Sequence, residues 1–362
     1  MDELAYWVGL SRVPGIGRVR FAQLEKHFGS LELAWKASAD ELRKAGLDSR
    51  AIAALQAVRS RVSLEEEMER LERHQVQVIA CQDRRYPARL SEIYDYPPLL
   101  FVKGELQPCD ACCLAVVGTR GPSMYGKQVA ADMAAGLARS GVTIVSGLAR
   151  GIDSIAHRSA LEVGGRTIAV FACGLDVVYP AENAELARRI MEHGALVSEY
   201  PLGIRPKADN FPRRNRILSG LSLGVLVVEA GESSGAMITA RQANEQDREV
   251  FAVPGSIHSP NSKGTNLLIQ RGWAKLVTDY TDILEELDLT MVAEQLEMRE
   301  VSEATDTELL LLNQVSTEPR HIDEICRLSG LPTPSVTSTL AVMELKGMVR
   351  QLGGMNYVLT KR

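Results

Sequence analysis

Basic and glycine-containing segments of this sequence are the places where phosphate groups could be held. The densest basic segment, residues 205–216, carries five positive charges and one negative charge beside an aromatic side chain, Phe211. An arginine fork donates two hydrogen bonds to one phosphate, and an aromatic ring stacks on a nucleobase. The segment therefore indicates a ligand that carries phosphates and bases.

Four glycine-containing loops offer further positions for an anion. Residues 118–121 and 146–151 each follow an apolar run and contain an arginine, whereas residues 231–235 and 262–266 precede helical segments. Glycine lets backbone N–H groups come close to an anion, and the dipole of a following helix adds a favourable potential. Several such loops together suit a ligand with more than one phosphate.

Two common phosphate-binding motifs are nearly matched, but each lacks an essential part. A dinucleotide fingerprint has a different glycine spacing and an acidic residue after its second strand, where this chain has Ser146-Gly147. Gly121, Gly126 and Lys127 match the spacing of a Walker A loop. Gln128 then replaces the Ser or Thr that holds Mg²⁺. We therefore predict no ATP hydrolysis and no cofactor.

The helical segment after the second loop begins near Asp153, which we expect to cap its N-terminus. His157 follows one helical turn later. We expect this histidine to be a structural hydrogen-bonding residue rather than a general base. The pair therefore predicts no catalytic site.

Strands that alternate with helices must position these loops. Six apolar runs of four or five residues, rich in Val, Ile and Leu, are typical of parallel strands buried on both faces. They are Leu114–Val117, Val142–Val145, Thr167–Phe171, Ala195–Ser198, Gly224–Val228 and Val250–Val253. The segments between them are amphipathic. This alternation predicts an α/β fold with a Rossmann-like, doubly wound sheet that binds its ligand at the carboxyl ends of the strands.

Composition limits the class of protein. The net charge of −5 excludes a uniformly basic surface but permits a local basic stripe. No apolar run reaches the roughly 18 residues of a membrane helix, so we expect no membrane contact. Without a signal peptide, six scattered cysteines predict a cytoplasmic protein. Cys109, Cys112 and Cys113 lack the second ligand pair of a zinc site, so we expect no metal.

The pattern divides the chain into four parts. Residues 1–62 are helical, residues 63–290 form the α/β domain, residues 291–304 are a linker, and residues 305–362 form a last domain. In that last domain, two short helices followed by a two-stranded β-hairpin predict a winged helix. Its second helix carries few cations, which leaves duplex DNA and protein contact open as its role.

A Gly-Ile-Gly turn at residues 15–17 predicts a helical hairpin near the N-terminus. Arg12, Arg18 and Arg20 flank it. In helix-hairpin-helix modules such a turn presents backbone amides to a nucleic-acid phosphate. Contact with DNA and a role in packing alone are both open for this hairpin.

In their order along the chain, these motifs resemble the DprA/Smf family of DNA-processing proteins. Residues 83–100 are similar to that family's extension of the Rossmann-like core, and the N-terminal helical part is similar to its helix-hairpin-helix or SAM-like domain. The other matching segments are residues 117–120, 146–153, 173–180, 211–217, 234–240, 253–256 and 264–269. The resemblance implies an extended Rossmann-like sheet between this helical domain and a winged helix.

The resemblance further implies binding of single-stranded DNA without catalysis. Members of the family protect DNA taken up in natural transformation and load the RecA recombinase onto it, typically as homodimers. Thr119, Ala181 and Ala236-Met237 depart from the family's commoner Ser, basic residue and Ser-Leu pair. The residues that we expect to bind DNA are Gly118, Thr119, Arg120, Gly147, Arg150, Gly151, Phe211, Arg214, Asn215, Arg216, Ser234, Gly235, Thr239, Lys263 and Asn266.

Two other functions use the same type of fold. One is hydrolysis of a nucleoside phosphate, as in the LOG-type phosphoribohydrolases, which carry a Gly-Gly-x-Gly-Thr-x-x-Glu loop. Residues 233–239 of this chain lack that glutamate, and with it the acid/base group. The other is a transcription regulator that senses a nucleotide in the core and reads duplex DNA with the winged helix.

Overall fold

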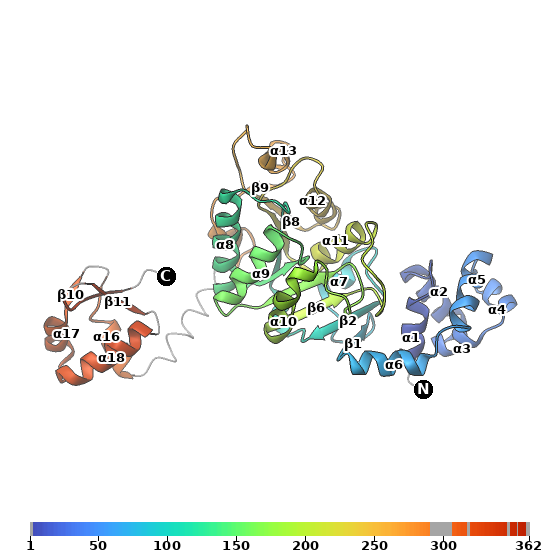
Figure 1. Ribbon diagram of the computed structural model, residues 1–362, viewed down its shortest axis with the longest axis horizontal. Helices are drawn as coiled ribbons and strands as arrows, with labels where there is room; N and C mark the ends of the chain where they lie inside the picture. The colour runs from blue at the N-terminus through green and yellow to red at the C-terminus, as the bar shows by residue number, and fades with distance from the viewer. Residues whose placement is uncertain (1–2, 290–305, 317–318, 346–347, 353, 360–362) are drawn as a thin grey trace. The chain divides into compact units, whose positions relative to one another are not determined.

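The computed structural model describes residues 3–289, 306–316, 319–345, 348–352 and 354–359. The chain forms two compact units, Met1–Thr290 and Met291–Arg362. The predicted linker, residues 291–304, lies outside the described residues. Figure 1 shows the first unit in blue to tan and the second in red. The predicted domain boundary at residue 62 stays a prediction.

The first unit begins with six helices. Serine and aspartate side chains cap several of them: Ser38 accepts a hydrogen bond from the Glu41 backbone, and Asp48 accepts one from the Ala51 backbone. Buried leucines, among them Leu24 and Leu55, form the core between the helices. The helices are α1 (Glu3–Ser11), α2 (Arg18–Phe28), α3 (Leu31–Lys36), α4 (Ala39–Lys44), α5 (Ser49–Arg59) and α6 (Leu64–Arg73).

A nine-stranded sheet forms the centre of the first unit, with the order β1-β2-β6-β5-β4-β3-β7-β8-β9. Seven strands, from β6 to β9 in that order, run parallel, while β2 is antiparallel to β6 and β1 is antiparallel to β2. The strands are β1 (Gln77–Ala80), β2 (Leu99–Gly104), β3 (Cys113–Val117), β4 (Thr143–Ser146), β5 (Thr167–Phe171), β6 (Gly194–Ser198), β7 (Gly224–Val227), β8 (Glu249–Ala252) and β9 (Lys275–Leu276).

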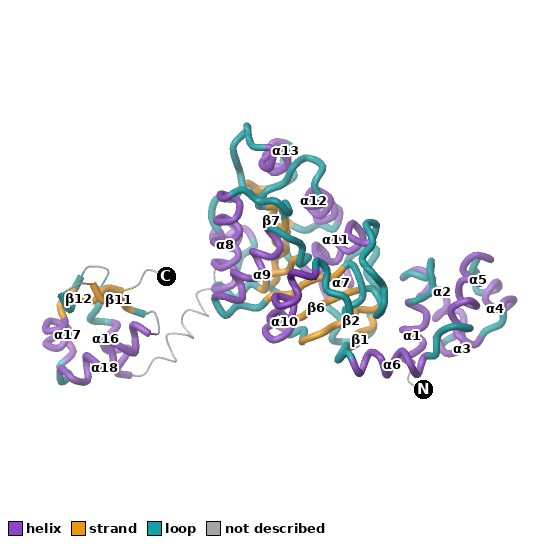
Figure 2. The backbone as a smooth tube through the Cα atoms, in the orientation of Figure 1, coloured by secondary structure: helices purple, strands orange, loops and turns teal. Residues whose placement is uncertain are grey.

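Both faces of this sheet are buried. In β5, Ala169 and Phe171 belong to one apolar cluster, and Ile168 and Val170 belong to another, because successive side chains of a strand point to opposite faces. Figure 2 shows α9 and α10 in front of the strands. The helices of this part are α7 (Ala88–Glu92), α8 (Met124–Arg139), α9 (Ile152–Glu162), α10 (Ala184–His193), α11 (Asn210–Leu221), α12 (Gly235–Glu245), α13 (Lys263–Gln270) and α14 (Tyr280–Glu286).

The strand order creates a switch point between β3 and β7. After β3 the chain winds through β4, β5 and β6 on one side, and after β7 it continues to β8 on the other. In open α/β sheets, ligands bind outside the carboxyl ends of the strands at such a point. The loops after β3, β4 and β7 therefore meet where the sequence predicts phosphate binding.

The second unit is a small domain of helices and a three-stranded sheet with the order β10-β12-β11. Its core holds Leu311, Ile325, Val336 and Leu340, which are fully buried. Its elements are α16 (Asp306–Leu312), β10 (Arg320–His321), α17 (Ile322–Ser329), α18 (Thr333–Leu345), β11 (Val349–Leu352) and β12 (Asn356–Leu359). This arrangement confirms the predicted winged helix, as the large sheet confirms the predicted fold class. Among the described residues, no helix is both long and apolar enough to span a membrane.

Candidate nucleic-acid interface

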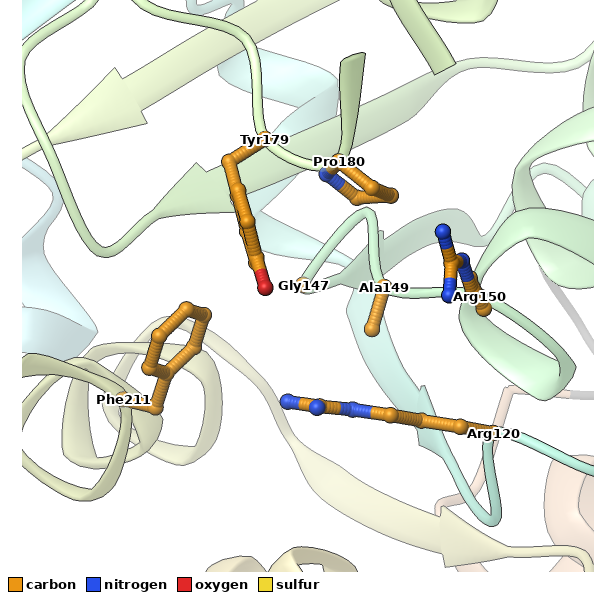
Figure 3. Close-up of a pocket in the computed structure, with 7 residues that line it drawn as sticks. All are labelled: Arg120, Gly147, Ala149, Arg150, Tyr179, Pro180 and Phe211. Atoms are coloured by element: carbon orange, nitrogen blue, oxygen red, sulfur yellow. The ribbon is translucent and has the colours of Figure 1, made fainter. Parts of the chain in front are cut away.

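A small pocket lies at the carboxyl ends of the strands, on the side of β4 and β5 (Figure 3). Its cavity volume is about 60 Å³, whereas pockets that enclose a small ligand measure roughly 300–1,000 Å³. The residues that line it are Arg120, Gly147, Ala149, Arg150, Tyr179, Pro180 and Phe211. The pocket therefore suits one part of a ligand that continues along the surface rather than a ligand enclosed on all sides.

A cation and two aromatic rings converge in this pocket. The guanidinium carbon of Arg120 lies 5.7 Å from the centre of the Phe211 ring. The Phe211 ring in turn contacts the Tyr179 ring, with 5.7 Å between their centres. Arg120 is exposed and forms no ion pair within the described part of the chain, and Figure 3 shows its side chain extending towards Phe211. A free cation beside aromatic rings can hold a phosphate while the adjacent base stacks.

Two side chains, Asp153 and Asn183, hold the loop after β4 in place by hydrogen bonds to its backbone. One carboxylate oxygen of Asp153 accepts hydrogen bonds from the Gly147 and Ala149 backbones, at 3.1 and 3.3 Å. The Asn183 amide donates to the Leu148 carbonyl at 2.9 Å. Leu148 itself has a φ of 55°, an unusual conformation for leucine. The fixed loop presents its Gly147 face to the pocket.

The expected capping role of Asp153 is wrong. The residue that precedes α9 is Gly151, which has a φ of 76° and no side chain to form a cap. Asp153 lies inside the first turn and closes the preceding loop instead. His157 is fully buried and its Nδ1 lies 2.6 Å from the Thr167 hydroxyl, as a structural role requires. Burial lowers the pKa of His157 to about 3, so its ring is neutral.

Arg150 reaches the pocket, but it already has a partner. Its guanidinium donates to both carboxylate oxygens of Glu182, at 2.8 and 2.7 Å. Both side chains are more than half exposed, so water and salt screen this pair strongly. A phosphate can therefore compete with Glu182 for Arg150.

Two arginines of the basic segment are turned into the protein. Arg214 is 3% exposed, and its guanidinium donates to the Val170 carbonyl. Burial raises the pKa of Asp153, and the nearby charge of Arg214 opposes that rise. Arg216 pairs with Glu199 at 2.5 Å and with Asp95 at 3.3 Å. The structure therefore does not bring these two predicted DNA contacts to the surface, and they support the site from inside.

Other cations of the same segment are exposed. Arg205, Lys207 and Arg213 face solvent near the start of α11. Asn215, the remaining predicted residue of this helix, is 8% exposed and donates to the Gly235 carbonyl at 3.3 Å. The surface charge of the segment thus comes from residues that the site prediction did not name.

The predicted residues around β3 shape the backbone. The Thr119 backbone N–H donates to the Glu229 carbonyl at 2.7 Å, which joins the ends of β3 and β7. A Cβ on Gly118 would lie 2.9 Å from that same carbonyl, so a larger residue does not fit there. A Cβ on Gly147 would collide with the Arg214 guanidinium. These glycines permit the close approach of neighbouring loops.

The predicted residues after β7 and β8 do not line the pocket with Arg120. Lys263 is exposed at the start of α13, and Gly235 is exposed at the start of α12 beside its cap, Ser234. Thr239 is buried and donates to the Gly235 carbonyl. Asn266 accepts a hydrogen bond from the Gly255 N–H and donates to its carbonyl, so its amide is already used.

Tyr179 and Pro180 are pocket residues that the site prediction missed. Both come after β5, the third strand whose carboxyl end reaches this edge. Their position directly after a predicted strand could have identified them, because every loop that follows a parallel strand of one sheet opens at the same edge.

Family models and known relatives identify the chain. The model of DNA recombination-mediator protein A matches residues 77–288, and the model of the DprA winged helix domain matches residues 297–355. The chain belongs to the DprA/Smf family of DNA-processing proteins. The resemblance to this family that the sequence motifs indicated is thereby confirmed.

Relatives are similar over most of their length. Protein Smf of Escherichia coli is 44% identical over 309 residues, which are 83% of this chain and 82% of that protein. The X-ray structure of DprA from Streptococcus pneumoniae has a TM-score of 0.67 at 37% identity, over 78% of this chain and 97% of that one. A structure that concerns the single-stranded DNA binding mode of Helicobacter pylori DprA has a TM-score of 0.53 at 32% identity, over 58% of this chain and 95% of that one.

Proposed function

We propose that this DprA/Smf protein binds single-stranded DNA at the pocket of Arg120, Tyr179 and Phe211 and catalyses no reaction. The observation that carries the proposal is the exposed Arg120 guanidinium, which has no ion-pair partner among the described residues, beside the Phe211 ring in a small surface pocket. The similarity to a relative described by its single-stranded DNA binding mode supports the choice of ligand.

The geometry favours a single strand over a duplex for a physical reason. The Phe211 and Tyr179 rings can stack only on a base that is not already stacked and paired within a helix. Arg120, and Arg150 once it leaves Glu182, supply charge for the phosphates on either side of that base. Arg213 and Lys207 of the same basic segment are also exposed.

We further propose that the protein acts as a homodimer in the cytoplasm and loads RecA onto the bound strand during natural transformation and recombination. Family membership supports this proposal. The loading step predicts a shorter lag before RecA hydrolyses ATP on single-stranded DNA. Sedimentation of the purified protein at several concentrations tests the dimer.

The alternative of nucleoside-phosphate hydrolysis finds no support in the site. The first carboxylate in α12 is Glu245, at the last position of the helix, whereas such enzymes need one in the first turn. The pocket, with a volume of about 60 Å³, is also too small to enclose a nucleotide. Release of a base from a nucleoside monophosphate by the purified protein would overturn our proposal that it is not an enzyme.

Fluorescence anisotropy with labelled oligo-dT tests the binding proposal. Arg120→Ala is expected to weaken binding by about tenfold or more, because a charged hydrogen bond to phosphate is lost. Arg139→Ala is the matched control, since Arg139 is also exposed but ends α8 at the opposite edge of the sheet. Equal affinity of the Arg120→Ala variant and the wild type would refute the proposed site.

A further inference from the structure

The arginines that flank the N-terminal hairpin are engaged within the protein. Arg12 forms an ion pair with Glu67 and donates to the Leu202 carbonyl at 2.8 Å. Arg18 donates to the Tyr94 carbonyl, and Arg20 pairs with Asp48 at 2.5 Å. The contact of Arg12 with Leu202 reaches the loop that follows β6, which is part of the sheet domain.

A second contact joins α6 to the loop that follows β5, and through it to the loop that follows β6. Arg70 of α6 forms an ion pair with Asp176 at 2.7 Å. The Asp176 carboxylate also accepts a hydrogen bond from the Gly203 N–H, with distances of 2.8 and 2.9 Å to its two oxygens. Gly203 has a φ of 85°, and a Cβ there would lie 3.2 Å from the Arg70 guanidinium. One carboxylate thus ties a helix to two loops.

These two loops carry the aromatic rings of the pocket. Asp176 lies in residues 172–180, which follow β5 and lead to Tyr179, while Gly203 lies in residues 199–209, which follow β6 and lead to Phe211. A hydrogen bond from the Gly174 N–H to the Ile204 carbonyl, at 2.9 Å, joins the loops further. The loops are therefore held together at one end by Asp176 and meet at the other end through the two rings.

We infer that Arg70 and Asp176 form a brace through which the N-terminal helices position Tyr179 and Phe211 for a nucleobase. The inference rests on the proposed binding of single-stranded DNA and assigns the helices a role that needs no DNA contact of their own. Asp176 is a positioning residue, since its side chain is 12% exposed and its oxygens are occupied by Arg70 and Gly203.

Two variants that remove charges of opposite sign distinguish a positioning role of the ion pair from simple electrostatic attraction to DNA. Arg70→Ala removes a positive charge, and Asp176→Asn removes a negative charge with almost no change of volume. Long-range electrostatics would make the first variant bind DNA more weakly and the second more tightly. A brace that orders the rings predicts weaker binding for both.

The test measures oligo-dT affinity over a range of salt concentrations for both variants of the full chain. We expect each variant to bind about fivefold to tenfold more weakly, because part of the stacking on the rings is lost. The slope of the logarithm of the binding constant against the logarithm of the salt concentration should stay unchanged. Loss of one phosphate contact would lower the magnitude of that slope by about 0.7. Arg43→Ala is the matched control, since it breaks an Arg–Asp ion pair of α4 that touches neither loop.

Hydrogen exchange of the DNA-free protein provides a readout that does not depend on DNA binding. Faster exchange in residues 174–180 and 200–210 of both variants, but not of Arg43→Ala, supports the brace. Tighter DNA binding by Asp176→Asn, or unchanged exchange of both loops, overturns it. Should the wild type fail to bind oligo-dT, the proposed function is overturned, and the exchange data still decide the brace. Asp176→Asn keeps the test decisive if Arg70→Ala does not fold.

Discussion

Replacing Phe211 by leucine separates stacking from charge at the proposed DNA site. The ring has two partners, the Arg120 guanidinium carbon at 5.7 Å and the Tyr179 ring at 5.7 Å between centres. Leucine keeps apolar contact with Tyr179 but offers no face to a base or to a cation. Base–aromatic stacking is worth about 1–3 kcal/mol, and an exposed cation–π contact is worth about 0.5–1 kcal/mol.

The expected loss of binding energy is about 2 kcal/mol, which corresponds to roughly thirtyfold weaker binding. Titration of labelled oligo-dT at several salt concentrations measures both the affinity and its salt slope. The slope should match the wild type, because Phe→Leu removes no charge, whereas Arg120→Ala should lower it by about 0.7. A less than twofold change in affinity, or a lower slope for Phe211→Leu, would refute the stacking role.

Two further predictions concern charge and pH. Glu182→Gln should bind oligo-dT severalfold more tightly at low salt, because Arg150 loses its competing carboxylate. This gain in affinity should vanish at high salt. Weaker binding of the variant in fluorescence anisotropy would contradict the prediction. The pKa of His157 is lowered by burial to about 3, below its usual 6.5, so between these values the unfolded chain binds a proton that the folded chain does not. The stability that neutral His157 contributes is therefore present above pH 6.5 and lost as the pH falls, by about 2 kcal/mol at pH 5. Urea unfolding of wild type and His157→Gln from pH 7 to pH 5 measures this loss, and an equal pH dependence of the two proteins would exclude it.

The strands of the sheet were predictable because burial on both faces demands continuous apolar runs. The six predicted runs correspond to β3 to β8, and no end differs by more than one residue. By contrast, β9 has only two residues, Lys275 and Leu276, and both are exposed. An edge strand of two exposed residues forms because β8 offers it hydrogen-bonding partners. It is too short to leave a hydrophobic pattern in the sequence.

The backbone geometry of the candidate site was predictable where it requires glycine, whereas the sequence did not reveal which side chains of α11 face solvent. Gly147 and Gly151 lie where close approach or a positive φ requires them. Arg213 and Arg214 are adjacent, but successive helical residues point about 100° apart, so one is exposed and the other is 3% exposed. Which of the two faces inward depends on how α11 packs on the sheet, which a run of charges does not reveal.

The small size of the pocket has a consequence for how a long polymer would arrive and leave if it binds there as we propose. A site that surrounds a strand must be threaded from a free end or must open, whereas a cavity of about 60 Å³ would contact only one part of the strand and could admit it sideways at an internal nucleotide. Under the proposed function, closed circles and linear strands would then be equivalent ligands.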